Sequence, residues 1–331
     1  MKIRDYIIRG FKIIYRKVTN KQFLPPECDC NRQSANDKIY NLLSIGCPCM
    51  ISRFGTTEIN CVNNYLTVNS KDSFYRKCIH YITDYTATPW WDEDHFRTMA
   101  VYSGIFPSTE ETAVRFSERY LQDSPQIDLL GCHQYVEKFM PLKKGVIKVQ
   151  LEMLYPFFVD RPWTRILKNK RVLIIHPFAK TIEAQYQKRD KLFENDQILP
   201  DFKLITYAPV QSLGGVSEFA SWFDALNHME NDIKKIDFDI CLLGCGAYGL
   251  PLAAFIKSIG KQAVHVGGGL QLFFGIKGNR WEADAYKDFW HYRPGIDINI
   301  NYRLLFNEYW VRASKDETPA TANKVENACY W

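Results

Sequence analysis

Short apolar runs alternate with helix-like stretches along most of this 331-residue chain, most regularly in its C-terminal half. Apolar runs of about five residues between polar or glycine-containing segments are typical of strands buried on both faces. Such runs occupy 49–54, 127–132, 146–151, 171–176, 203–207, 238–243 and 262–266. Helical patterning follows the turn at 55–58 as far as residue 66, and recurs at 35–44, 72–85, 109–122, 181–193, 216–235 and 249–259. Strands that alternate with helices predict βαβ units, so we expect an α/β fold: a Rossmann-like parallel sheet flanked by helices.

The first 18 residues predict an amphipathic helix. One apolar stripe at helical spacing contains Ile3, Ile7, Phe11, Ile14 and Val18, and six basic residues stand against a single acid, Asp5. Basic residues beside an apolar stripe are typical of a helix that lies on an anionic bilayer. A helix docked on its own domain, or on a second subunit of a homo-oligomer, fits the same pattern. Both interpretations stay open at this point.

The composition is that of a globular protein, with 46% hydrophobic residues, and the pattern divides the chain into three parts. Residues 1–34 form the basic helix and a linker, 35–312 form the α/β domain with halves of about 35–165 and 166–312, and 313–331 form a polar tail. We find neither a secretion signal nor an apolar run long enough to cross a bilayer. A cytoplasmic protein is therefore expected, with peripheral attachment to the inner membrane face through residues 1–18 as the alternative.

Charge and cysteine content narrow the function classes. The net charge of +5 suits a polyanionic small ligand such as a nucleoside diphosphate, or an anionic membrane, and is too dispersed to indicate nucleic-acid binding. Two of the ten cysteines form the pair Cys28/Cys30 and two form Cys47/Cys49, a C-x-C spacing that differs from that of zinc fingers. We expect reduced thiols, with a metal site across the two pairs as the alternative.

A glycine-rich turn joins the strand at 238–243 to the next helix. Gly244, Gly246 and Gly249 form G-x-G-x-x-G, a pattern that exposes backbone N–H groups to phosphate at a helix N-terminus, with Tyr248 inside the turn. A dinucleotide fold requires an acidic residue at the end of the following strand, whereas that strand here ends at His265 and three glycines. NAD is therefore not expected. Tight helix–strand packing is the alternative role of these glycines.

A second candidate turn follows the strand at 49–54. Its sequence is Arg53-Phe-Gly55-Thr56-Thr-Glu58. Because ligands of open α/β sheets bind at the carboxyl ends of strands, Arg53 is placed to hold a phosphate and Glu58 to face the same cleft. An Arg53–Glu58 pair that only holds the turn, with Glu58 favoured by the helix dipole, explains the same residues.

Further candidates follow other predicted strands. The donor-binding candidates are His176, Lys180, Gln211, Ser212, Lys277 and Arg280. Glu152 lies in an apolar stretch, where a carboxylate is either paired for structure or serves as a base with a raised pKa.

The Arg-Phe-Gly-x-x-Glu turn resembles the motif of GT-D fold glycosyltransferases, bacterial enzymes of surface-glycan synthesis. The glycine turn at 244–249 and the strand at 171–176 with its loop are also similar, so the resemblance covers about 35–275. It implies transfer of a sugar from a nucleotide-sugar to a glycan or lipid-linked acceptor, with Arg53, Gly55 and Glu58 in the site and Glu58 or Glu152 as the base. The family places Asp where this chain has Thr56. A hydroxyl is a weak ligand for Mn²⁺ or Mg²⁺, so Glu58 remains the single candidate metal ligand and the need for metal is in doubt.

Two other functions stay open. One is a dinucleotide-dependent Rossmann oxidoreductase, against which the missing ribose-binding acid argues. The other is a non-catalytic nucleotide-binding scaffold of a glycan-synthesis complex, which the Thr56 departure keeps open.

Overall fold

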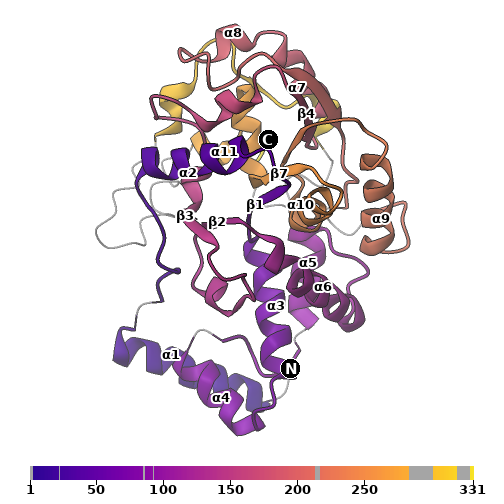
Figure 1. The fold of residues 1–331 in the computed structure, drawn as a ribbon. Coiled ribbons are helices and arrows are strands. Elements are labelled where there is room, and N and C mark those ends of the chain that lie inside the picture. The colour runs from indigo at the N-terminus through magenta and orange to yellow at the C-terminus, as the bar shows by residue number, and fades with distance from the viewer. Residues whose placement is uncertain are drawn as a thin grey trace.

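A seven-stranded, entirely parallel sheet forms the centre of the protein (Figure 1). The computed structural model describes residues 3–21, 23–84, 86–91, 93–212, 217–282, 301–318 and 329–331. The strands are β1 (Cys49–Arg53), β2 (Leu129–Cys132), β3 (Ile147–Gln150), β4 (Arg171–Ile175), β5 (Lys203–Tyr207), β6 (Ile240–Leu243) and β7 (Gln262–His265), in the spatial order β3-β2-β1-β7-β6-β4-β5. The predicted α/β fold with a Rossmann-like parallel sheet is confirmed.

Helices lie on both faces of the sheet, and α1 and α4 pack together away from it (Figure 1). They are α1 (Ile3–Thr19), α2 (Arg32–Ser44), α3 (Thr56–Asn69), α4 (Phe74–Thr83), α5 (Glu93–Ser103), α6 (Glu110–Asp123), α7 (Ala179–Tyr186), α8 (Arg189–Leu192), α9 (Trp222–Ile233), α10 (Gly249–Ser258) and α11 (Asn279–Glu282). Two 3₁₀ turns, η5 (Gly246–Tyr248) and η6 (Gly267–Phe274), follow β6 and β7. A small two-stranded sheet pairs β8 (Ile276–Lys277) with β9 (Val311–Arg312).

Successive strand residues supply the cores on opposite faces of the sheet. In β4, Val172 and Ile174 belong to one core, together with residues of α2, α7 and η6. Leu173 and Ile175 belong to the other core, together with residues of α3, α6, α9 and α10. Because strand side chains alternate in direction, a strand covered on both faces must be apolar throughout. This is why the strands appear in the sequence as uninterrupted apolar runs.

The pairing of β1 with β7 closes the sheet between the two halves of the chain. Ile51 lies opposite Val264, although more than two hundred residues separate them. From β1 the chain builds outward through β2 and β3, then crosses over to β4 on the other side. Strand order therefore reverses beside β1 and β7, and the carboxyl ends of all the strands share one edge of the sheet.

Several predicted elements differ from those observed. The helix expected over 181–193 is two short helices, α7 and α8. The helix expected over 216–235 begins only at Trp222, where the side chain of Ser221 caps it by accepting a hydrogen bond from the Asp224 N–H. Residues 213–216 lie outside the described part. Helix α5 was not expected, because its sequence lacks a clear apolar period. The described part of the C-terminal tail packs against the domain: Cys329 is buried and Trp331 contacts Phe178.

The described residues contain no helix that is both long and apolar enough to cross a membrane. None of the ten cysteines forms a disulfide bond. Within the described part of the chain, no three metal-ligating side chains gather at one place, so the C-x-C pairs do not form the alternative metal site.

The contact between α10 and β7 gives a test of this core. A Cβ built on Gly249 would lie 2.2 Å from Nε2 of the His265 ring. Gly249→Ala should therefore destabilise the protein by about 1–3 kcal/mol through overpacking, measured by denaturant unfolding. Gly10→Ala is the matched control: nothing lies within 4 Å of its added Cβ, so the helical substitution should be neutral or stabilising. Equal effects of the two substitutions would contradict this packing.

Candidate functional site

A cavity of about 180 Å³ lies at the carboxyl edge of the sheet, where the strand order reverses. The segments that follow β1, β4, β6 and β7 all line it, through Arg53, His176, Gly246 and His265 among others. The two glycine-bearing turns, at Gly55 and at Gly246, thus meet at one cavity. This is the position at which open α/β folds bind their ligands.

The turn after β1 places two charged side chains at the cavity. Gly55 is the N-cap of α3, and a Cβ built on it would lie 1.8 Å from Oε2 of Glu58. The carboxylate therefore folds back over Gly55, which explains why glycine stands three residues before the glutamate. Among the described residues, neither the Arg53 guanidinium nor the Glu58 carboxylate has a hydrogen-bond or ion-pair partner. The alternative, in which the two residues pair to hold the turn, is not seen.

The three glycines of the second turn have different roles. A Cβ on Gly244 would lie 2.7 Å from the His176 ring, and one on Gly249 would meet His265, so both residues allow close packing. Gly246 has a φ of +58° with nothing within 4 Å of an added Cβ. Its backbone adopts a conformation that favours glycine and borders the open cavity. Tight packing thus accounts for the first and third glycines, and a site role is left for Gly246.

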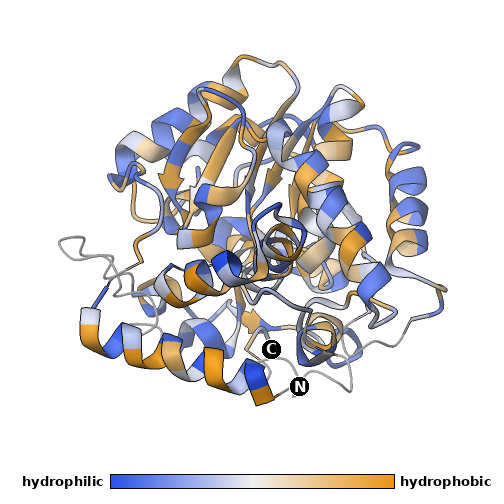
Figure 2. Ribbon diagram, turned by 90° about the horizontal axis from the view of Figure 1, so that it is seen from below, coloured by the Kyte–Doolittle hydropathy of each residue, from blue (hydrophilic) through white to orange (hydrophobic). Residues whose placement is uncertain are grey.

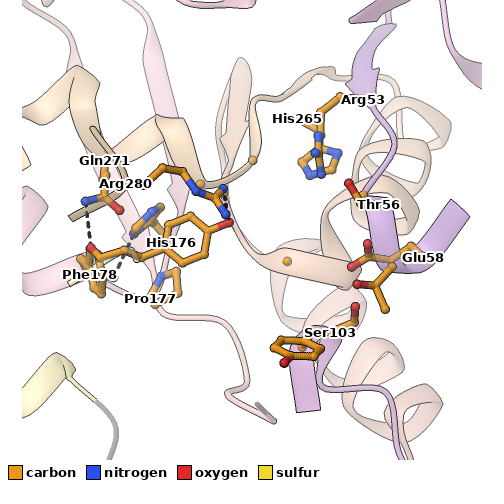
Figure 3. Close-up of a pocket in the computed structure, with 18 of the residues that line it drawn as sticks. Arg53, Thr56, Glu58, Ser103, His176, Pro177, Phe178, His265, Gln271 and Arg280 are labelled. Atoms are coloured by element: carbon orange, nitrogen blue, oxygen red, sulfur yellow. Dashed lines mark hydrogen bonds between the residues drawn. The ribbon is translucent and has the colours of Figure 1, made fainter. Parts of the chain in front are cut away.

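Residues from the segments after β4 and β7 line the side of the cavity that faces Glu58. Figure 3 shows His176, Gln271 and Arg280 across the cavity from Thr56, Glu58 and Ser103. Arg280 donates a hydrogen bond of 2.9 Å to the Tyr330 hydroxyl, and its guanidinium lies 4.7 Å from the centre of that ring. The cavity is therefore bordered by two guanidinium groups and one carboxylate, with aromatic rings beside them.

Two buried polar atoms in the cavity wall have no hydrogen-bond partner among the described residues. They are Ser103 Oγ and Gln271 Oε1. The orientation of Gln271 is fixed, because its amide nitrogen donates to the carbonyls of Ile276, Lys277 and Tyr330. A buried acceptor without a partner costs free energy unless a ligand or water satisfies it. Both atoms belong to residues that line the cavity.

Both histidines of the cavity are neutral at physiological pH. Burial lowers the pKa of His176 to about 3. Burial, and next the positive charge of Arg53, lower the pKa of His265 to about 3. Nδ1 of His176 accepts the Phe178 N–H at 3.0 Å, and Nδ1 of His265 lies 3.1 Å from Ser52 Oγ. Neither ring is a strong base at neutral pH.

The structure brings together nine of the residues expected in the site. These are Arg53, Gly55, Thr56, Glu58, His176, Gln211, Gly244, Gly246 and Arg280. It does not bring Glu152, Lys180, Ser212, Tyr248, Gly249 or Lys277 into the cavity lining.

Glu152 is buried away from the cavity and accepts a hydrogen bond from the Tyr302 hydroxyl. This is the paired, structural arrangement rather than that of a base.

Lys180 points to the surface, where its ammonium pairs with Asp316 at 2.9 Å. The N-terminus of α7 is already occupied, because the Glu317 carboxylate accepts hydrogen bonds from the N–H groups of Lys180 and Thr181. The Glu317 carboxylate thus occupies the N-terminus of α7, where a bound phosphate was expected near Lys180. Lys277 lies on β8, with its ammonium 5.5 Å from the Phe306 ring.

Ser212 and Tyr248 support the cavity from behind. Their hydroxyl groups lie 3.0 Å apart, and Ser212 Oγ also donates to the Gly104 carbonyl at 2.7 Å. The Tyr248 ring stacks on Trp222 with centres 5.0 Å apart. These contacts fix the segment that carries Ser103.

Sequence reasoning missed several residues of the cavity. His265 and Gly267 had a visible signal, since they end a buried strand beside the glycine turn. Ser103, Gln271, Tyr330 and Trp331 had none, because the tertiary fold alone brings α5, η6 and the C-terminus to this edge.

The residues present do not fit a divalent-cation site. Glu58 is the one carboxylate among the cavity-lining residues, Thr56 offers a hydroxyl, and the described part of the chain holds no cluster of three ligands. Hard cations prefer several oxygen ligands, usually more than one of them a carboxylate.

Comparison with protein-family models, with curated proteins and with solved structures finds no match to this chain.

The neutral state of His176 gives a pH prediction. A histidine with a folded pKa of about 3 and an ordinary pKa of 6.5 contributes fully above pH 6.5, and its contribution is lost as the pH falls below that value. At pH 5 the loss should be roughly 2 kcal/mol of unfolding free energy. His176→Asn keeps an acceptor for the Phe178 N–H and should remove this share of the acid sensitivity. Denaturant unfolding at pH 7.5 and pH 5 measures the difference.

His228→Asn is the control, because that ring is 50% exposed and lies outside the cavity. It should lose as much stability on acidification as the unchanged protein does. An identical acid response in His176→Asn would show that His176 is not held neutral by burial.

Proposed function

We propose that this protein is a nucleotide-sugar glycosyltransferase of the GT-D type, acting on a glycan or lipid-linked acceptor in surface-polysaccharide synthesis. The observation that carries the proposal is the meeting of the Arg53–Glu58 turn with the Gly246 turn at one cavity. The first turn supplies a cation and a carboxylate that have no partner in the described part of the chain, and the second supplies a glycine-rich backbone. Transfer from a diphosphate donor needs all three: charge neutralisation, a base and a close approach of backbone to phosphate.

In this reaction, the bond between the anomeric carbon and the diphosphate oxygen breaks, and a bond to the acceptor oxygen forms. The electron pair of the broken bond stays on the diphosphate. Arg53 and Arg280 would stabilise the negative charge that develops there. The acceptor hydroxyl would give its proton to Glu58, the acidic side chain among the described residues that line the cavity.

No step of this mechanism passes through a metal ion, because the donor set at Thr56 and Glu58 is poor for one. In the proposed transferase, the guanidinium groups of Arg53 and Arg280 therefore provide the positive charge that a metal ion would otherwise provide. An assay with and without Mn²⁺ tests this point directly.

Ligand binding separates the proposal from its alternatives. Nucleoside diphosphates and nucleotide-sugars at about a hundred times Kd should stabilise the protein by about 2.7 kcal/mol, seen as a raised Tm. Stabilisation by NAD instead would favour the oxidoreductase. Nucleotide binding without any sugar transfer would favour the non-catalytic scaffold. The absence of any shift would overturn nucleotide recognition altogether.

Arg53→Gln should weaken nucleotide binding by about ten- to a hundredfold, because it removes a charge-assisted contact to phosphate. The matched control is Arg189→Gln, since Arg189 pairs with Asp201 outside the cavity. Titration calorimetry with the stabilising nucleotide compares the two variants. Equal affinities would exclude Arg53 from the phosphate site.

Glu58→Gln should lower turnover about 10²- to 10⁴-fold while leaving nucleotide affinity nearly unchanged, because it removes the base and keeps the shape. The control is Glu118→Gln, since Glu118 accepts a surface hydrogen bond from Tyr65 at 3.2 Å. Turnover is measured with whichever nucleotide-sugar stabilises the protein. Full activity of Glu58→Gln would remove Glu58 from the mechanism.

A further inference from the structure

Helix α1 turns its apolar stripe away from the protein. The exposed fractions are 81% for Ile3, 55% for Ile7, 55% for Phe11, 59% for Ile14 and 80% for Val18. Figure 2 shows the hydrophobic positions of α1 along the outer edge of the molecule. A helix that docked on its own domain for hydrophobic reasons would bury this stripe. The observed orientation is the reverse.

Polar and basic side chains hold α1 against the domain. Asp5 is buried, the Lys12 ammonium lies 3.7 Å from the centre of the Tyr81 ring, and the Arg4 guanidinium lies 4.4 Å from that of Phe74. Lys12 also donates to the Thr86 carbonyl at 3.3 Å. These contacts fix which side of the helix faces outward.

The neighbouring helix α4 adds to the same end of the molecule. Figure 1 shows α1 and α4 packed together, away from the central sheet. The exposed apolar side chains of α4 are Phe74, Tyr75 and Ile79. We call the exposed apolar residues of both helices the α1/α4 apolar face. Single exposed apolar residues are ordinary, whereas a group of this size on two adjacent helices marks an interaction surface.

The charge of these helices identifies the partner. Together α1 and α4 carry seven basic residues and one acid, and that acid, Asp5, is buried. Exposed cations beside the face include Arg4, Lys17 and Arg76. A second copy of the chain would bring two such basic helices together, and their like charges would repel. An anionic bilayer satisfies both features, since the acyl region receives the apolar side chains and the headgroups receive the cations.

We propose that the α1/α4 apolar face docks the protein on an anionic membrane surface, with α1 lying in the plane of the interface. Tyr6, Phe11 and Tyr75 are exposed aromatic residues of the kind found at headgroup depth. The docking rests on this surface alone and is independent of the reaction proposed for the cavity.

Vesicle flotation with the full chain tests the proposal. The protein should float with phosphatidylcholine vesicles that contain phosphatidylglycerol, should bind pure phosphatidylcholine at least about tenfold more weakly, and should be released by high salt. The double variant Phe11→Glu/Ile14→Glu should reduce binding to the anionic vesicles by about tenfold or more. Its Tm should stay unchanged, because both side chains are exposed.

The matched control is Ile45→Glu/Leu304→Glu, which alters two residues that are 68% and 74% exposed outside the two helices. It should bind the anionic vesicles as the unchanged protein does. Three results would overturn the proposal: no binding to anionic vesicles, equal loss in both double variants, or a solution dimer that only Phe11→Glu/Ile14→Glu dissociates. Nucleotide binding measured on the same variants keeps a failure here separate from a failure of the proposed transferase.

Discussion

The pairing of β1 with β7 is the constraint on which the rest of the structure depends. It joins the two halves of the chain into one parallel sheet and puts the segments after β1, β4, β6 and β7 at the same edge. Parallel strands must all end on one side, so every loop that leaves this edge meets the others. If Ile51 and Val264 were not neighbours, Arg53 and Gly246 could not share a cavity.

The cavity built there combines charge with rigidity. Glu58 is held over Gly55 by the first turn of α3, and Gln271 is held by three carbonyl groups. Such groups keep their geometry without a ligand, and a preorganised polar site needs little rearrangement when charge develops. A reaction that moves negative charge onto a diphosphate would gain from both properties.

The α1/α4 apolar face follows a different physical logic from the cavity. Inside the domain, apolar residues are buried and charges lie outside. On α1 the arrangement is inverted, because basic side chains contact aromatic rings and a backbone carbonyl of the domain while isoleucine and phenylalanine face outward. This arrangement leaves the apolar side facing outward, and a bilayer surface is the partner proposed above.

The sequence by itself determined the seven strands, most of the helices and the class of fold, since strands covered on both faces must be apolar runs and helices between them must be amphipathic. It also indicated Arg53, Glu58 and the glycine turn as site residues, because each belongs to a short motif next to a predicted strand and can be recognised from neighbouring residues alone. It could not distinguish Glu152 from Glu58, because burial against Tyr302 is a long-range contact. Nor could it show that Glu317 caps α7 in the place of a ligand, or that Ser103 and Gln271 reach the cavity. Local patterns fix the period of each segment, whereas strand order and the direction in which α1 faces are decided only when distant segments pack.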